Sequence, residues 1–296
     1  MATVDAAAPA HDQVVPAFAP PSTRRGWWHR FAGNRLALVC LILAVLVIAT
    51  AAVGPILYGV DPNYQNYTAI NAWPSTAHPL GTDSLGRDVY SRIVWGARPT
   101  LLYALEPVVV SLLVGLPIGL VSGYFGGRVD RVLMWLTEIG MAFPGVVLLL
   151  IVLSMFSSQF WLAMAFFGFL SAPPLIRFIR GATLNVRREL FIDAALVAGR
   201  SHAYVVWTHI ISRIRGVILV QVTLLTSGGV MMMAGMGYLG FGPKPPNPTW
   251  GSMITEAQQV MAQSSWLLLF SGGVTGILVL ALGLVGDAVR DASVEA

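Results

Sequence analysis

The sequence predicts an all-α membrane protein with six transmembrane helices and with both termini in the cytoplasm. Of its 296 residues, 56% are hydrophobic and only 11% are charged, whereas soluble domains carry about 25% charged residues. The chain also contains six long apolar runs. Runs of about 20 residues can cross a hydrocarbon core of about 30 Å, and backbone bonding in lipid favours helices over open strands.

The expected organisation begins with a disordered cytoplasmic tail, residues 1–30, which is rich in alanine and proline and has no hydrophobic period. The first apolar run starts only near Leu36 and is too long for the core of a cleavable signal peptide. A transmembrane domain is therefore expected over 31–291. Its six spans are expected at 36–58, 100–124, 132–156, 161–179, 217–238 and 266–285.

Basic residues set the expected orientation, because cytoplasmic loops of membrane proteins are enriched in lysine and arginine. With the N-terminus inside, 14 of the 18 basic residues fall on the cytoplasmic side. The four on the outer side are Arg87, Arg92, Arg98 and Lys244. This bias accounts for the net charge of +4 without a polyanionic partner, so we expect no nucleic-acid binding.

Motifs for catalysis and metal binding are absent from the sequence. Lys244 is the only lysine and is followed by proline, so no G-x-x-x-x-G-K-[ST] phosphate loop exists. Cys40 is the only cysteine, and the five histidines lie in the tail or in loops. We therefore expect no enzyme activity, no catalytic residue, no metal ion and no bound cofactor on this chain.

The cytoplasmic loop at 180–215 predicts a short helix, a glycine turn and a second helix. Residues at the i, i+3, i+4 and i+7 spacing form one face of the first helix, namely Phe191, Ala194, Ala195 and Ala198. Gly199 suits the left-handed position after a helix, and Ser201 can cap the next helix. Two interpretations fit this pattern, a partner-binding helix pair or an amphipathic helix lying on lipid.

Four short motifs resemble a known family. The segment Asp193-Ala194-Ala195 followed by Gly199 resembles the coupling loop of bacterial ABC importer permeases, with aspartate for the usual glutamate and Ser212 for a usual proline. Two outer-loop segments and one C-terminal segment resemble signatures of the C-type permease of dipeptide and oligopeptide importers. These segments are His78–Asp88 continuing to Gly96, Tyr238–Gly251, and Gly286-Asp287 with Arg290-Asp291.

The resemblance implies a type I ABC importer permease-like fold with a cytoplasmic coupling helix, in a multi-pass protein of the bacterial inner membrane. Such a subunit forms half of a translocation pathway for di- or oligopeptides. Its implied partners are a second homologous permease, two ATPase subunits that hold ATP and Mg, an external substrate-binding protein, peptide and lipid. Related permeases also carry nickel chelates or other small solutes, and a stand-alone secondary transporter is the competing class.

Three groups of candidate site residues follow from the motifs. The expected ATPase-coupling residues are Asp193, Ala194, Ala195, Gly199, Arg200 and Ser201. The expected docking residues for the binding protein are Asp83, Arg87, Asp88 and Trp250, of which the first three fit equally well a role in holding their own loop. The pathway candidates are Thr223, Ser227, Met231, Met232 and Glu106, with an ordinary core helix as the alternative for the first four.

Two further features of the spans carry expectations. Small residues recur every fourth position in the second span and predict close helix packing, either within the subunit or at a subunit interface. They are Ser111, Gly115, Gly119, Gly123 and Gly127. Glu138 is expected to pair with a loop arginine. Glu106 fits a peptide amino group as well as a water-exposed or paired role, since charges in membranes are costly.

Overall fold

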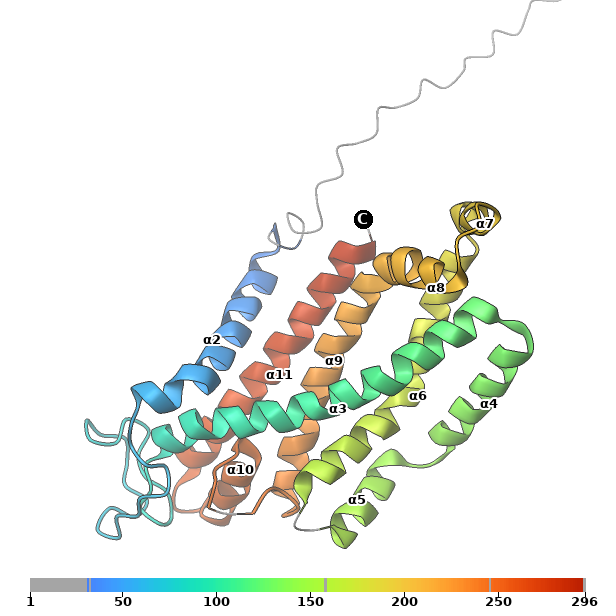
Figure 1. The fold of residues 1–296 in the computed structure, drawn as a ribbon. Helices are drawn as coiled ribbons and strands as arrows, with labels where there is room; N and C mark the ends of the chain where they lie inside the picture. The colour runs from blue at the N-terminus through green and yellow to red at the C-terminus, as the bar shows by residue number, and fades with distance from the viewer. Residues whose placement is uncertain (1–30, 32, 157–158, 245, 295–296) are drawn as a thin grey trace, which may run out of the picture.

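The computed structural model describes residues 31, 33–156, 159–244 and 246–294, so the tail expected at 1–30 lies outside the described residues. No β-strand forms in the described part, where Thr82 and Asp88 make one isolated bridge. The helices, shown in Figure 1, are α2 (Arg35–Leu57), α3 (Val89–Phe125), α4 (Gly127–Ala142), α5 (Gly145–Met155), α6 (Phe160–Arg187), α7 (Leu190–Val197), α8 (His202–Tyr204), the π-helical turn η1 (Val205–Ile210), α9 (Ile211–Tyr238), α10 (Trp250–Gln259) and α11 (Ser265–Val294).

The long helices form one bundle whose two ends differ in character. Within the described residues, five helical runs are long and apolar enough to cross a membrane, and the bent pair α4–α5 makes a sixth. The start of α2, the end of α11 and the short helices α7 and α8 lie at one end, while α10 and the loop at 59–88 lie at the other (Figure 1). The six-span prediction holds when the bent pair is counted as one span, and the arginine bias assigns the α7 end to the cytoplasm.

Small residues let α3 and α6 approach each other closely. A Cβ atom built on Gly119 would lie 2.7 Å from Cβ of Ile179, and one on Gly123 would lie 2.7 Å from Cβ of Thr183. At the first position of the stripe, the Ser111 hydroxyl donates a hydrogen bond to the carbonyl of Gly168 at 2.6 Å. The close packing therefore lies within the subunit. Gly127 takes no part in it, because it begins α4.

Replacing Gly119 with alanine is expected to destabilise the protein by about 1–3 kcal/mol, because the added methyl group overpacks the contact between α3 and α6. Gly181 on α6 is the matched control, since no heavy atom lies within 4 Å of a Cβ built there. Gly181→Ala should be neutral or stabilising, as alanine favours the helix. Thermal unfolding in detergent compares the two variants, and equal midpoints would contradict the packing argument.

The span expected as one helix at 132–156 is broken, which corrects that prediction. Its two halves, α4 and α5, meet at an angle of 69°. Phe143, between them, has an extended backbone with φ −90° and ψ 139°. Pro144 follows it, and a proline disfavours the helical conformation in the preceding residue and lacks an N–H group for the helix.

Other boundaries also differ from the expected ones. α3 begins 11 residues before the predicted start, because the carboxylate of Asp88 accepts the N–H of Ser91 at 2.7 Å and caps the helix there. α6 continues to Arg187, which shortens the predicted loop at 180–215 from its N-terminal side. The outer loop after α9 contains a further helix, α10, which packs into the bundle through Met253 and Ala257.

Candidate functional site

The cytoplasmic end carries a segment, Leu190–Ile210, that we call the coupling segment. Its first part is α7, which projects beyond the ends of the long helices (Figure 1). Gly199 ends this helix with a left-handed backbone, φ +79°, and the N–H of Arg200 returns to the carbonyl of Ala195 at 3.1 Å. The hydroxyl of Ser201 then accepts the N–H of Tyr204 at the start of α8. The predicted helix–glycine–helix structure is confirmed.

Aromatic and basic side chains fasten the coupling segment to the long helices. The hydroxyl of Tyr124, near the end of α3, lies 2.7 Å from Nδ1 of His202. The guanidinium of Arg213 on α9 lies 5.4 Å from the ring centre of Phe191 on α7, within the range of a cation–π contact. The coupling segment therefore contacts both α3 and α9, two of the membrane-crossing helices.

The outward face of α7 is partly apolar. It consists of residues at the i, i+3, i+4 and i+7 positions, namely Leu190, Asp193, Ala194 and Val197. Leu190 is 87% exposed and Val197 is 90% exposed, whereas Ile192 is fully buried. The sequence analysis did not include Leu190 and Val197. The same helical spacing would have identified both residues if it had been counted from Leu190 and not from Phe191.

The expected coupling residues are divided between this face and its surroundings. Asp193 and Ala194 lie on the face, and Asp193 also pairs with Arg187 at 2.7 Å. Ala195 is partly buried and packs towards the bundle. Gly199, Arg200 and Ser201 form the exposed turn that follows α7, with the guanidinium of Arg200 4.9 Å from the ring centre of Tyr204.

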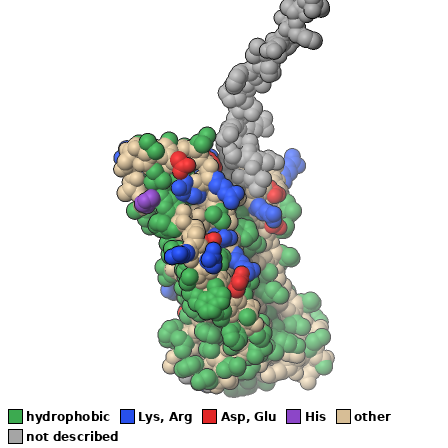
Figure 2. Space-filling model, turned by 90° about the vertical axis from the view of Figure 1, so that its right-hand side faces the viewer, with side chains coloured by type: hydrophobic (Ala, Val, Ile, Leu, Met, Phe, Trp, Pro, Cys, Tyr) green, Lys and Arg blue, Asp and Glu red, His purple; other side chains and the backbone are tan. Residues whose placement is uncertain are grey.

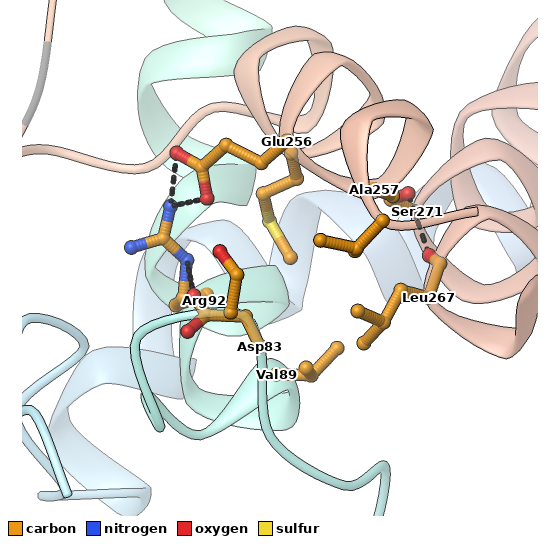
Figure 3. Close-up of a pocket in the computed structure, with 10 residues that line it drawn as sticks. Asp83, Val89, Arg92, Glu256, Ala257, Leu267 and Ser271 are labelled. Carbon is orange, nitrogen blue, oxygen red and sulfur yellow. Dashed lines mark hydrogen bonds and ion pairs between the residues drawn. The ribbon is translucent and has the colours of Figure 1, made fainter. Parts of the chain in front are cut away.

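At the opposite end, four charged side chains form a cluster that we call the outer clamp, namely Asp83, Arg87, Arg92 and Glu256. Nε of Arg87 lies 2.7 Å from Oδ2 of Asp83, and its Nη2 lies 2.6 Å from Oε2 of Glu256. Nη2 of Arg92 lies 2.9 Å from the same oxygen of Glu256. Figure 3 shows Arg92 between the two carboxylates. The two positive and two negative charges compensate one another and join the first outer loop to α10.

The docking residues expected from the sequence are buried, which corrects that prediction. Asp83, Arg87, Asp88 and Trp250 are each between 2% and 6% exposed. Asp88 caps α3 and pairs with Nδ1 of His78 at 2.8 Å, and the indole N–H of Trp250 donates to the carbonyl of Ile93 at 2.9 Å. Side chains enclosed in this way hold the loop's own fold, which was the alternative interpretation for the first three.

A small cavity lies beside the outer clamp, with Asp83, Arg92 and Glu256 among the residues that line it (Figure 3). Its volume of about 20 Å³ has room for roughly one water molecule. The outer clamp thus has a structural role, because it holds the first outer loop to α10. The sequence analysis did not assign Arg92 and Glu256 to this cluster. A signal was available for one of them, because Glu256 is the only acidic residue between 239 and 286.

The pathway candidates on α9 do not share one face. Ser227 donates to the carbonyl of Val279 on α11 at 3.0 Å, and Thr223 lies against Gly286 of the same helix. Met232 packs in the cluster formed with α5 and α6, while Met231 is 68% exposed. Among these four residues, only Met231 points freely outward from the subunit.

The two acidic residues of the spans have different surroundings. Oε1 of Glu138 lies 3.5 Å from Nη2 of Arg177, and both side chains are largely exposed. Glu138 thus has an arginine partner as expected, although Arg177 lies on α6 and not in a loop. Glu106 is half-buried on α3 and has no hydrogen-bond or ion-pair partner among the described residues.

The sequence matches two family descriptions. Residues 115–295 match the family described as binding-protein-dependent transport system inner membrane component. Residues 22–74 match the N-terminal TM domain of oligopeptide transport permease C. The fold resembles a chain of the MetNI methionine ABC transporter in an inward-facing conformation, with a TM-score of 0.52 and 18% identity over 68% of this chain and 96% of that one.

Three curated relatives match over nearly their whole length. They are the dipeptide transport system permease protein DppC of Haemophilus influenzae (34% identity, 93% of this chain and 95% of the relative), the glutathione transport system permease protein GsiD of Pectobacterium atrosepticum (32%, 94% and 94%) and the di/tripeptide transport system permease protein DppC of Pseudomonas aeruginosa (31%, 96% and 95%). Together with the six spans and the projecting coupling segment, these matches show that the chain belongs to the family of binding-protein-dependent transport system inner membrane components and is a multi-pass protein of the bacterial inner membrane.

Proposed function

We propose that the chain forms half of the translocation pathway of an ATP-driven importer for di- and oligopeptides. The three relatives are named for dipeptides, glutathione and di- or tripeptides, all of them short peptides, which supports this substrate class. A second homologous permease would complete the pathway, and an external binding protein would deliver the peptide. Two ATPase subunits would bind ATP and Mg beneath the cytoplasmic end.

The outward face of α7 is the observation that carries the ATP-driven part of the proposal. Leu190 and Val197 expose 87% and 90% of their surface on a helix that projects from the cytoplasmic end. Burying a side chain of this size in a partner contributes about 1.5–3 kcal/mol. An apolar face of this kind, next to the small Ala194, fits a cleft in an ATPase subunit.

The contacts of the coupling segment supply a route from the ATPase to the membrane helices. A shift of α7 would act on α3 through Tyr124 and His202, and on α9 through Phe191 and Arg213. A ligand changes a conformational equilibrium only by its difference in affinity for the two states. ATP on the partner subunits would provide that difference by favouring one position of the coupling segment.

The free face of α9 suits a passage for varied side chains. It contains Leu224, Gly228 and Met231 at the i, i+4 and i+7 positions, and all three are exposed in the subunit. A flexible thioether adapts to different neighbours, and Gly228 leaves open space, because no heavy atom lies within 4 Å of a Cβ built there. In the assembled importer this face would turn towards the second permease.

Reconstitution tests the proposal directly. Proteoliposomes that contain the chain, its second permease and the two ATPase subunits should take up a labelled dipeptide only when ATP, Mg and the binding protein are supplied. A non-hydrolysable ATP analogue is the control and should not support repeated uptake. Uptake by vesicles that contain this chain alone would overturn the proposal in favour of a stand-alone carrier.

A further inference from the structure

α4 has an inner side that contacts its own bundle. Thr137 is the buried residue of this helix, with 4% of its surface exposed. Asp130 lies on the same side, where its Oδ2 accepts Nη2 of Arg180 on α6 at 2.6 Å. The hydroxyl of Ser122 donates to the other oxygen of Asp130 at 2.5 Å. The carboxylate nearest to the start of α4 is therefore already used within the bundle.

The opposite side of α4, which we call the outward stripe, consists of Arg128, Arg131, Trp135 and Ile139. These positions are i, i+3, i+7 and i+11, and all four residues are exposed, Trp135 by 60% and Ile139 by 41%. Arg128 and Arg131 have no hydrogen-bond or ion-pair partner among the described residues. Two guanidinium groups thus stand free at the cytoplasmic end of a membrane-embedded helix.

We propose that the outward stripe binds anionic phospholipid of the cytoplasmic leaflet, with Arg128 and Arg131 on the headgroup phosphates. The order of side chains along α4 matches the layers of a leaflet, with guanidinium groups first, an indole at the next level and an aliphatic chain below. At 1.5 Å per residue, Arg131 lies about 6 Å and Arg128 about 10 Å above Trp135 along the helix axis. Indoles prefer the membrane interface, and arginines beyond it attract anionic lipid.

The surface of the molecule agrees with this layering. Figure 2 views the side on which α4, α5 and α6 lie in Figure 1, and it shows basic side chains together with fewer acidic ones in the upper and middle part, above a lower part of mostly hydrophobic side chains. Arg128 and Arg131 stand at the cytoplasmic end of a membrane-embedded helix without an acidic partner among the described residues, so the negative charge of an anionic phospholipid headgroup complements them. Bound lipid would fix the depth of α4, which is joined to α3 by Gly126 and Gly127, both with positive φ.

Quenching of Trp135 fluorescence by brominated lipids tests the proposal. The full chain, purified with its accompanying subunits, is placed in nanodiscs that contain brominated phosphatidylglycerol or brominated phosphatidylcholine. The signal of Trp135 is the difference between the native protein and Trp135→Phe. Because each arginine at an anionic surface strengthens binding by about fivefold, the two arginines together should favour phosphatidylglycerol in the relative binding constant by about 25-fold.

Two double variants decide the outcome. Arg128→Gln with Arg131→Gln should lower the preference for phosphatidylglycerol to about one, since the site loses both cations. Arg215→Gln with Arg290→Gln removes the same charge from exposed positions on α9 and α11 and should leave the preference unchanged. Equal quenching by both lipids in the native protein would overturn the proposal, as would no quenching at all, which would show protein covering the stripe. The readout involves no transport, so its failure would leave the proposed function standing.

Discussion

Replacing Leu190 and Val197 with aspartate is expected to abolish ATP-driven uptake while the membrane helices stay folded. Both side chains are almost fully exposed in the subunit, so the change removes no contact that the fold needs. Apolar anchors of an interface contribute about 2 kcal/mol or more each, which corresponds to roughly 30-fold in affinity. Two buried carboxylates would add a desolvation penalty. Co-purification of the ATPase subunits and dipeptide uptake in proteoliposomes measure the effect.

The matched control for this experiment is Asn34→Asp with Asn185→Asp. Both asparagines are exposed at the cytoplasmic end, at the start of α2 and near the end of α6, outside the face of α7. This control adds the same two carboxylates, so a general effect of negative charge would appear in both proteins. Normal uptake by the variant of Leu190 and Val197, with the ATPase subunits still attached, would remove the outward face of α7 from the mechanism.

Removal of the Glu256 carboxylate is expected to cause the largest loss of stability. The side chains of Arg87 and Arg92 are 6% and 2% exposed, and Glu256 bonds to both. Glu256→Ala would leave two like charges enclosed without that carboxylate. Breaking a buried ion pair from one side typically costs about 3–5 kcal/mol. The midpoint of thermal unfolding should fall, and protease should cut the loop at 59–88 more readily.

Two further variants test whether the loss of stability arises from the outer clamp itself. Glu189→Ala breaks a surface pair with Arg213 at 4.0 Å, in which both side chains are largely exposed, and should cost less than about 1 kcal/mol. Adding Arg92→Gln to Glu256→Gln removes one cation together with the anion. The double variant should be more stable than Glu256→Gln alone, as expected for coupled neighbours. Equal unfolding midpoints for Glu256→Ala and Glu189→Ala would rule out the clamp as a major source of stability.

The spans were predictable because their signal is local. Twenty apolar residues in sequence define a crossing whatever the rest of the chain does, and the Gly199 turn follows from a single residue with a backbone preference. The break before Pro144 was also readable, since a proline inside an apolar run disfavours a continuous helix. The break was nevertheless not predicted, because the residues on both sides of Pro144 are hydrophobic enough to be counted as one continuous span.

The outer clamp could not be predicted, because it depends on residues far apart in the chain. Glu256 meets Arg92 across 164 positions, and no local pattern records which arginine a carboxylate will face. The sequence motif around Asp83 marked the right loop but left its charged residues open between a docking surface and the loop's own fold. Burial decides between the two roles, and burial is a property of the folded bundle.

α3 reaches both the outer clamp and the coupling segment. It holds Arg92 near its beginning and Tyr124 near its end, within 37 residues, a rod of about 55 Å. A rod of that length acts as a lever, and a tilt of about 5° around its middle would move each tip by about 2 Å. If ATP on the partner subunits moves the coupling segment, as we propose, α3 would carry that movement to the outer clamp on the other side of the membrane.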